Sequence, residues 1–288
     1  MILDEHYTLA NGVRIPKLGL GTWFINNEEA PEAVRTATDI GYRHIDTAQA
    51  YGNEQGVGEG VRGCGVDRDD LFVTTKLAAE AKSHGEATAA IDGSLSTLGL
   101  DHIDLMLIHS PRPWMQFHED DRHLEGNREA WRALEDAHRA GKLRAIGVSN
   151  FDELDVANIV DACTVRPMVN QVLAHISNTP RDLIARMRDL DILVEAHSPI
   201  AHGELMKNTT VAEMAGRYGV SVPQLSIRYL LQLGLLPLPK TANPAHMRDN
   251  AGVDFEISEE DMRALITIDP IADYGEAGMW PVYGGRLG

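Results

Sequence analysis

The amino-acid sequence predicts a single domain, residues 1–288, with the α/β fold of a closed (β/α)8 barrel, the TIM barrel. Short apolar runs alternate with longer segments of helical character, which indicates parallel strands connected by helices. Eight such units fit into 288 residues, which suits one barrel of typically ~250 residues. An open doubly wound sheet is disfavoured, because the first strand leads into GLGTWF, which lacks the third glycine of the dinucleotide-binding fingerprint.

The chain begins with two short apolar runs around Asn11-Gly12, the dipeptide most typical of a tight hairpin turn. The eight barrel strands are expected after this hairpin. They are the apolar runs at 18–22, 43–46, 71–76, 103–109, 144–150, 168–172, 192–199 and 235–240.

Helical segments follow the strands, and several of them begin with a helix-capping residue. Asp152 and Thr179 are candidate N-caps, the latter with Pro180 at the first helical position. Ser258 opens a pattern like a capping box. The predicted helices are residues 28–41, 53–63, 84–99, 127–141, 152–163, 179–191, 209–219, 221–234, 243–252 and 258–269.

The composition is that of a globular protein, with 43% hydrophobic and 24% charged residues. The formal net charge of −17 argues against non-specific binding to nucleic acid, which requires basic patches. No apolar run approaches the ~20 residues that span a bilayer, and the N-terminal residues do not have the pattern of a secretory signal. Cys64 and Cys163 lie in no metal or redox motif, so we expect two free thiols and a cytoplasmic protein.

Polar residues end most of the predicted strands. In a (β/α)8 barrel the active site lies at the carboxyl-terminal ends of the strands, so these side chains are expected to converge on one mouth. Polar strand ends are common, but Asp, Lys and His at the ends of three successive buried strands are a stronger indication of a site. The residues are Asp46, Lys76, His109, Ser149, Asn150, Asn170, Gln171, His197, Ser198, Lys240 and Thr241, with Trp23 just after the first strand.

Three of these side chains, together with Tyr51, suit the reduction of a carbonyl group. Lys76 is expected to pair with Asp46 and to lower the pKa of Tyr51 from its reference value of ~10. Tyr51 would then donate a proton near neutral pH, and His109 would orient the same substrate oxygen. No side chain supplies hydride, so this chemistry requires a nicotinamide cofactor.

Three stretches resemble the motifs of the aldo-keto reductase family: DTAQAYGNE (46–54), GKLRAIGVSNF (141–151) and LPKTANPAHMRDN (238–250). LGLGTW and VTTK fit in order and spacing, and the similarity, which is to bacterial-type members such as diketo-gluconate reductase-like enzymes and aldehyde reductases, spans nearly the whole chain. The resemblance implies a barrel closed at the bottom by the N-terminal hairpin, and reversible NAD(P)H-dependent carbonyl reduction. Carried over by position, the catalytic residues are Asp46, Tyr51, Lys76 and His109.

The resemblance also implies a set of cofactor-binding residues. Ser149, Asn150 and Gln171 would contact the nicotinamide amide, and helix N-terminal amides would assist with the phosphates. The implied set is Thr22, Trp23, Ser149, Asn150, Gln171, His197, Ser198, Ile200, Leu205, Lys240, Thr241, His246, Asp249 and Asn250.

Two of these cofactor positions depart from the family pattern. His246 stands where an Arg usually pairs with the 2′-phosphate of NADPH, and His is mostly neutral at pH 7 whereas Arg is always charged. Because Lys240 still favours a phosphate, we expect NADPH as the cofactor, with weaker discrimination against NADH than is usual. His197 replaces the aromatic residue that stacks under the nicotinamide, and imidazole offers less stacking area.

The substrate side departs further. Ala78 and Ser110 occupy positions where family members often carry aromatic residues, which predicts a wider pocket there. The candidate pocket residues are Trp23, Phe24, Ala78, Ser110 and Trp114.

The long loop at 110–128 and the tail at 271–288 are the least regular segments. Such loops set substrate choice, and Trp114 and Phe117 are expected to cover a substrate. The His and acidic residues at 118–123 lack the spacing of a metal site, so we expect no bound metal. The tail, rich in Gly and aromatics, leaves three alternatives: a lid over the pocket near the barrel mouth, packing on the barrel wall, or a dimer contact.

Other functions remain compatible with the same fold. A nucleotide-binding, redox-sensing accessory protein could keep the whole tetrad. A metal-dependent hydrolase would need clustered His and Asp ligands at several strand ends, which His109 beside Lys76 does not supply. We expect a small-molecule carbonyl substrate and a monomer, and the choice among aldehydes, ketoses, keto-acids, diketo-sugars, quinones and ketosteroids stays open.

Overall fold

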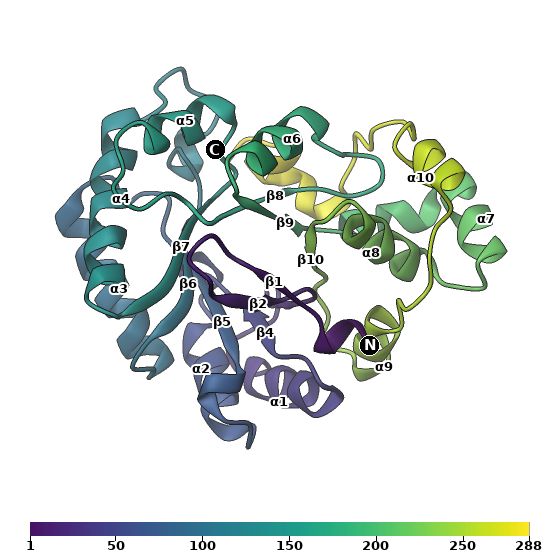
Figure 1. Ribbon diagram of the computed structural model, residues 1–288, viewed down its shortest axis with the longest axis horizontal. Helices are drawn as coiled ribbons and strands as arrows, with labels where there is room; N and C mark the ends of the chain where they lie inside the picture. The colour runs from purple at the N-terminus through teal and green to yellow at the C-terminus, as the bar shows by residue number, and fades with distance from the viewer. Residues whose placement is uncertain (288) are drawn as a thin grey trace.

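Eight parallel strands form the centre of the fold in the computed structural model, which describes residues 1–287 (Figure 1). Each strand pairs with its neighbour in chain order, which confirms the predicted barrel. The strands are β3 (Leu20–Gly21), β4 (His44–Asp46), β5 (Phe72–Leu77), β6 (Ile103–Ile108), β7 (Leu143–Ser149), β8 (Val169–Leu173), β9 (Leu193–His197) and β10 (Leu236–Leu238).

The barrel closes between its first and last strands. A parallel bridge joins Gly21 to Lys240, and the amide of Gly19 donates to the carbonyl oxygen of Pro237 at 3.3 Å. A Cβ atom on Gly19 would lie 2.5 Å from the Leu238 side chain. The glycines of the LGLGT segment therefore permit the close strand contact that completes the barrel.

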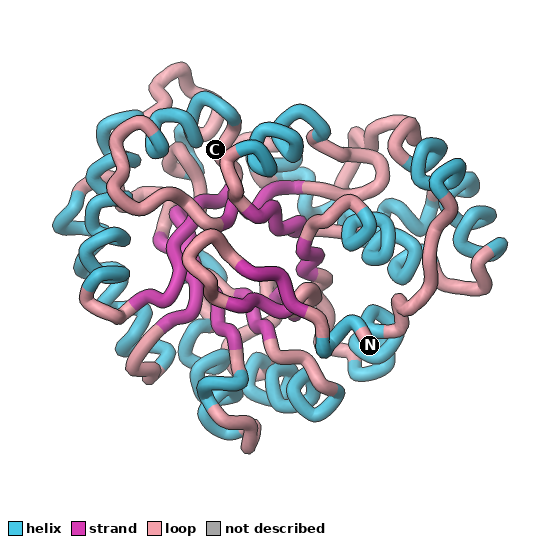
Figure 2. The backbone as a smooth tube through the Cα atoms, in the orientation of Figure 1, coloured by secondary structure: helices cyan, strands magenta, loops and turns pink. Residues whose placement is uncertain are grey.

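Helices surround the strands, as Figure 2 shows in cyan around magenta. They are α1 (Ala30–Ile40), α2 (Glu54–Gly63), α3 (His84–Leu98), α4 (Leu124–Arg139), α5 (Glu153–Val160), α6 (Arg181–Asp189), α7 (Thr209–Arg217), α8 (Val222–Gln232), α9 (Pro244–Ala251) and α10 (Glu259–Leu265). No helix within residues 1–287 is long and apolar enough to cross a membrane.

Two of the three predicted helix starts are confirmed. The Asp152 side chain accepts from the amides of Leu154 and Asp155, and the Ser258 side chain accepts from that of Asp261. The third prediction is wrong, because Pro180 itself is the N-cap of α6. The Thr179 hydroxyl bonds to the carbonyl oxygen of His175 and to a tyrosine hydroxyl of α8 instead.

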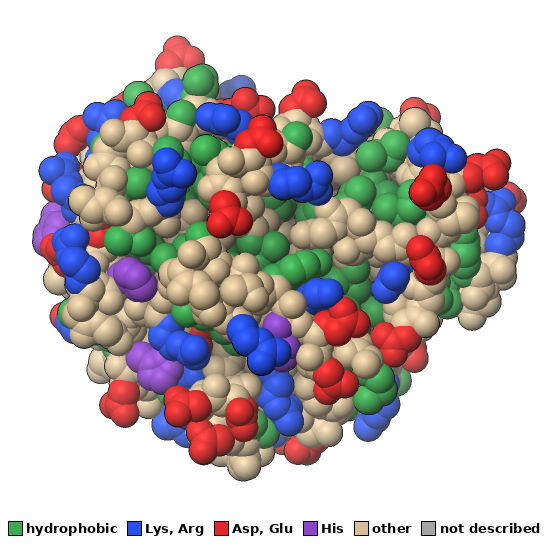
Figure 3. Space-filling model, viewed as in Figure 1, with side chains coloured by type: hydrophobic (Ala, Val, Ile, Leu, Met, Phe, Trp, Pro, Cys, Tyr) green, Lys and Arg blue, Asp and Glu red, His purple; other side chains and the backbone are tan. Residues whose placement is uncertain are grey.

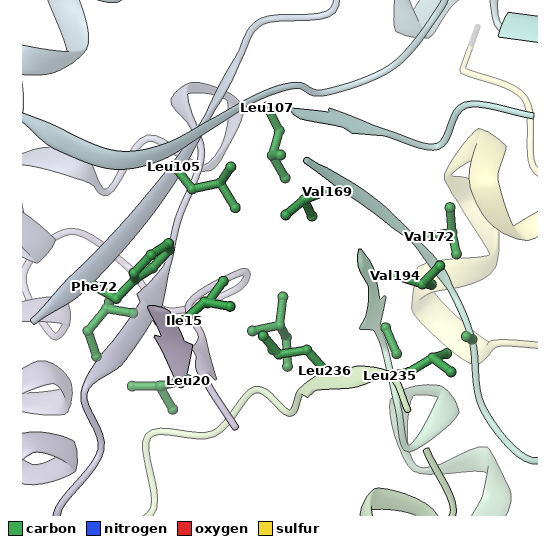
Figure 4. Packing of buried hydrophobic residues seen from close by; sticks show 14 of the residues in the cluster. Ile15, Leu20, Phe72, Leu105, Leu107, Val169, Val172, Val194, Leu235 and Leu236 are labelled. Atoms are coloured by element: carbon green, nitrogen blue, oxygen red, sulfur yellow. The ribbon is translucent and has the colours of Figure 1, made fainter. Parts of the chain in front are cut away.

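The N-terminal hairpin crosses one end of the barrel (Figure 1). Its strands β1 (His6–Thr8) and β2 (Arg14–Pro16) are antiparallel, and Gly12 in the turn has a φ of 84°. Ile15 is fully buried and lies near Phe72 and Leu236 (Figure 4). Because these two residues begin β5 and β10, the hairpin covers the amino-terminal end of the barrel, as predicted.

The core is the apolar filling between the strands and the helices. Every residue of β5 and β6 is buried. A second part of the core lies inside the barrel, where Figure 4 shows Leu105, Leu107 and Val169 pointing into the space that the strands enclose. On the surface, acidic and basic side chains are interspersed over the face drawn in Figure 3. The candidate site lies at the opposite end of the barrel, where the carboxyl-terminal ends of the strands meet. Gly288, the last residue of the predicted tail, lies outside the described residues.

Candidate active site

A cavity of about 560 Å³ lies at the carboxyl-terminal ends of the strands. It brings together most of the predicted site residues, although they come from segments as far apart as β4 and α9. The predicted residues that line it are Trp23, Phe24, Asp46, Tyr51, His109, Ser149, Asn150, Gln171, His197, Ser198, Ile200, Lys240, Thr241, His246, Asp249 and Asn250.

Lys76, on β5, is fully buried beside this cavity. Its Nζ donates to Asp46 Oδ1 at 2.6 Å, to the carbonyl oxygen of Thr47 at 2.9 Å and to the Tyr51 hydroxyl at 3.3 Å. Burial alone would lower the pKa of Lys76, but Asp46 and Tyr51 outweigh it and raise the pKa. The ammonium is therefore charged and has a partner for each of its three protons.

Tyr51 ends a 3-10 helix, Gln49–Tyr51, that follows β4. The Gln49 side chain anchors this helix, because it donates to the Ala90 carbonyl oxygen at 2.8 Å and accepts from the Ala78 amide at 2.7 Å. Burial raises the pKa of Tyr51, and Lys76 opposes this shift without reversing it. The prediction that Lys76 would leave the pKa of Tyr51 below its ordinary value is wrong, because losing water around a phenolate costs more than one ammonium restores.

His109 follows β6 directly, and its ring centroid lies 5.6 Å from that of Tyr51. Burial lowers the pKa of His109 well below its ordinary value, and Lys76 and His197 lower it further. The imidazole is therefore neutral at pH 7 and carries one N–H. Its Nδ1 is buried without a hydrogen-bond partner in the described part of the chain. A lone pair without a partner there is less costly than an N–H, so the proton belongs on Nε2.

Amide and hydroxyl groups from β7, β8 and β9 form the next wall of the cavity. Asn150 donates to the His109 carbonyl oxygen at 3.0 Å, and its own side-chain oxygen lies 3.0 Å from His197 Nε2. The Ser149 hydroxyl donates to the Gln171 carbonyl oxygen at 2.9 Å. Burial lowers the pKa of His197 to about 3, so this wall presents neutral hydrogen-bonding groups.

The far end of the cavity lies at α9 and carries an exposed cation. Lys240 follows β10 and is exposed, as is His246 on α9. Partial burial lowers the pKa of Lys240, and Glu29 opposes the shift. Asn243 caps α9 by accepting from the amide of Ala245 at 2.8 Å.

Backbone strain gathers at the same place. Seven non-glycine residues in the described chain have positive φ. Four of them line the cavity: Phe24, Asn150, Ser198 and His202. Each such residue costs about 1–3 kcal/mol and is retained where the surrounding structure requires that conformation, most often at a functional site.

Besides Lys76, five residues predicted to bind cofactor or substrate lie outside the cavity lining among residues 1–287. Leu205 is fully buried, and so is Thr22, whose hydroxyl donates to the Asp46 carbonyl oxygen. Ser110 is also fully buried, and its backbone oxygen accepts from Lys82 Nζ at 3.0 Å. The backbone amide of Ala78 donates to the side-chain oxygen of Gln49. Trp114 stands behind His109, edge to face at 5.0 Å.

The loop at 110–128 and the tail meet beside the cavity. His118 Nε2 lies 2.7 Å from the carbonyl oxygen of Gly285, and Trp114 stacks on Phe117. Across the described residues there is no group of three His, Cys, Asp or Glu side chains that could hold a metal ion.

Of the three alternatives for the tail, the structure agrees with the lid, because the tail packs over the mouth of the cavity. Tyr283 lines the cavity, and its hydroxyl lies 2.6 Å from Ser198 Oγ and 3.0 Å from His202 Nε2. The Tyr283 ring also stacks on Trp23 at 6.1 Å. Trp280 meets Trp23 edge to face at 5.9 Å.

Sequence reasoning missed two side chains beside the site. His202 lines the cavity from the 3-10 helix Ala201–Lys207, and no local motif marks it. Glu195 lies on β9 two residues before His197 and is fully buried. The two-residue period of a strand indicates that Glu195 shares the inward face of His197, and that pattern could have identified it.

Comparisons with known proteins agree with this geometry. The model of the aldo/keto reductase family matches residues 17–269. The chain is 41% identical over 270 residues to the uncharacterized oxidoreductase YtbE of Bacillus subtilis, covering 91% of this chain and 92% of the relative. It is 39% identical over 262 residues to the glyoxal reductase of Bacillus subtilis, covering 90% and 91%.

A solved structure shares the whole architecture. The aldo-keto reductase of Bombyx mori, solved in complex with NADP, superposes with a TM-score of 0.84 at 32% identity, covering 98% of this chain and 97% of that one. The fold, the family match and the extent of both sequence relationships lead to one conclusion: this chain is a member of the aldo/keto reductase family.

Proposed function

We propose that the protein reduces an aldehyde or ketone to the alcohol, reversibly, with NADPH as the preferred cofactor, and that Tyr51 is the proton donor. The observation that carries this proposal is the buried chain of contacts from Asp46 through Lys76 to Tyr51, which opens on a cavity shared with His109. Family membership supports carbonyl reduction as the class of chemistry.

Each of the four residues has a part that follows from its surroundings. The raised pKa of Tyr51 keeps its hydroxyl protonated at neutral pH, so it can give a proton to a carbonyl oxygen. Lys76 stabilises the phenolate left behind, and Asp46 keeps Lys76 charged at 2.6 Å. His109 donates from Nε2 and orients the same oxygen.

The residues around the cavity fit a nicotinamide dinucleotide. Such a cofactor supplies the hydride that no side chain can. Ser149, Asn150 and Gln171 present amide and hydroxyl groups for a carboxamide. The exposed Lys240 provides a cation for a phosphate at the other end of the same cavity. The likeness to a reductase solved with NADP supports the same cofactor here.

The preference for NADPH over NADH should be modest. His246, on α9, lines the same cavity as Lys240. An imidazole gives a 2′-phosphate neither a fixed charge nor a planar pair of donors. A preference above about a thousandfold in kcat/KM, which corresponds to ~4 kcal/mol, would contradict this proposal.

The test is a panel of aldehydes and ketones assayed with both reduced cofactors. Turnover of NADPH with a simple aldehyde is expected, together with its near loss in Tyr51→Phe. A protein that binds NADPH but turns over no carbonyl in the panel would instead support a nucleotide-binding, redox-sensing accessory protein. The glyoxal reductase among the relatives makes small dicarbonyls the first substrates to try.

A further inference from the structure

Glu195 is a fully buried carboxyl group inside the barrel, bonded to Gln171 of the cavity lining but not itself part of that lining in the described chain. It belongs to β9, between Leu236 of β10 in register on one side and Gln171 of β8 on the other. Burying a carboxyl group is costly unless a specific partner offsets the loss of water. Its partners therefore indicate what it does.

One amide nitrogen links Glu195 to the catalytic carboxylate. Gln171 Nε2 donates to Glu195 Oε2 at 2.8 Å and to Asp46 Oδ2 at 2.9 Å. The other oxygen of Asp46 accepts from Lys76, which in turn reaches the Tyr51 hydroxyl. A continuous chain of hydrogen bonds thus runs from Glu195 across the barrel to the proposed proton donor.

The same contacts decide which way the Gln171 amide points. The Asp46 carboxylate, paired with the Lys76 ammonium, only accepts hydrogen bonds, so the side-chain nitrogen of Gln171 must face Asp46. Glu195 Oε2 accepts from the same nitrogen. The side-chain oxygen of Gln171 is then the atom left for the cavity that this residue lines. With Asp46 alone as its acceptor, the amide would have one fixed contact instead of two.

The charges along this chain are unbalanced. Two carboxyl groups share one ammonium, and burial together with Asp46 raises the pKa of Glu195 to about 8, against the effects of Gln171 and Lys76. Its Oε1 is buried with no partner among residues 1–287. Glu195 is therefore neutral at pH 7 and becomes a second anion in the barrel interior at alkaline pH.

The histidines that face Glu195 do not titrate over this range. Asp46 and His44 face the interior from β4, Lys76 from β5 and His197 from β9 itself. Burial lowers the pKa of both His44 and His197 to about 3. The neighbours on β8 and β10 are Gln171 and Leu236, neither of which titrates.

We propose that Glu195 is a positioning residue for the reaction, acting through Gln171 on the Asp46–Lys76 pair and through that pair on the Tyr51 hydroxyl, an inference that rests on the proposed reduction. When Glu195 ionises, its charge adds to that of Asp46 and strengthens the hold of Tyr51 on its proton. The residue thus extends carbonyl reduction to higher pH than the other four groups would allow.

The test compares the wild-type protein with Glu195→Gln, which still accepts from Gln171 but cannot ionise. Aldehyde reduction with NADPH and oxidation of the product alcohol with NADP⁺ are followed from about pH 6 to the highest pH at which both proteins stay folded, because the pKa of Tyr51 is raised above its reference value of ~10. At pH 6 we expect reduction rates within ~twofold. The alkaline loss of reduction should move ~0.5–1 pH unit lower in the variant, and alcohol oxidation should begin correspondingly earlier.

A spectroscopic titration measures the same quantity without turnover. Tyrosinate absorbance is recorded for each protein and for the same protein carrying Tyr51→Phe, and the difference reports the Tyr51 phenol. The midpoint should lie lower in Glu195→Gln by the same ~0.5–1 pH unit. If the wild type turns over no carbonyl, the proposed reduction is wrong, and this titration still decides the role of Glu195.

Glu54→Gln is the matched control. Glu54 is also a buried carboxyl, 7% exposed, but it accepts from the Thr75 hydroxyl at 2.6 Å and has no contact with the chain to Tyr51. The Glu54→Gln variant should leave unchanged both the pH dependence of reduction and the midpoint of the Tyr51 titration. If Glu195→Gln does not fold, the apolar Glu195→Met serves instead. An unmoved Tyr51 midpoint, or an equal loss of rate at every pH, would show that Glu195 only fills the barrel.

Discussion

Replacing Lys76 by Met removes the charge at the centre of the site while keeping most of the side chain's volume. Lys76 Nζ makes three hydrogen bonds, to Asp46, Thr47 and Tyr51. Breaking a buried ion pair by removing one partner costs about 3–5 kcal/mol, because the other charge stays buried. Since the folded-state pKa of Lys76 is raised, the pair contributes its full stability at pH 7 and loses it only as the pH rises through that value.

This change should affect the rate of reduction more strongly than it affects the free energy of unfolding. Without the ammonium, the phenolate of Tyr51 has no counter-charge, so proton donation becomes harder by a factor of about 10²–10⁴. The pKa of Tyr51, already raised by burial, should rise further, and the residual activity should persist to higher pH than in the wild type. The assays are urea unfolding at pH 7 and kcat for aldehyde reduction as a function of pH.

The double variant Lys76→Met with Asp46→Asn separates the two effects. It removes both charges, so most of the lost stability should return, whereas activity should stay low because Tyr51 still has no cation. A single variant with an unshifted pH profile would refute the role of Lys76 in setting the proton affinity of Tyr51. A double variant no more stable than the single one would refute the ion-pair reasoning.

Tyr51→Phe should lower kcat by at least ~100-fold with unchanged NADPH binding by fluorescence titration, and activity within tenfold of wild type would mean that Tyr51 is not the acid. His246→Arg should raise the NADPH-to-NADH ratio of kcat/KM by about tenfold, the worth of one hydrogen bond to a charged group, and an unchanged ratio would place the 2′-phosphate elsewhere. Because the pKa of Glu195 is raised to about 8 above its ordinary value near ~4.3, the folded state holds this proton more tightly. Its contribution to the free energy of unfolding is present at low pH and falls by up to ~1.4 kcal/mol per pH unit as the pH rises towards 8. Urea unfolding of the wild type against Glu195→Gln measures that slope, and parallel curves would contradict it.

The local pattern of the chain was enough to predict the architecture. Strand periodicity, Asn11-Gly12 and the caps at Asp152 and Ser258 act over a few neighbouring residues, and the structure confirms each of them. The misplaced start of α6 has a non-local cause, because Thr179 bonds to a hydroxyl 50 residues away on Tyr229.

The sequence predicted which residues lie near the site better than it predicted where their side chains point. Ser110 follows His109 directly, yet His109 lines the cavity whereas Ser110 is fully buried outside its lining. Leu205 matched the family by position, but its apolar side chain packs into the core. Counting along the chain identifies a position, whereas the local backbone path decides which way the residue faces.

The sequence by itself determined the barrel, its closing hairpin and the set of strand-end residues that meet at one mouth, because parallel strands of one barrel all finish at the same end. Only the tertiary structure decided the net shift in the pKa of Tyr51, the packing of Tyr283 over the cavity and the link from Glu195 to Asp46. Each of these depends on the depth of burial and on distances between residues far apart in the chain, such as the 125 positions that separate Gln171 from Asp46. Burial and long-range distance are properties of the packed molecule, and no local pattern encodes them.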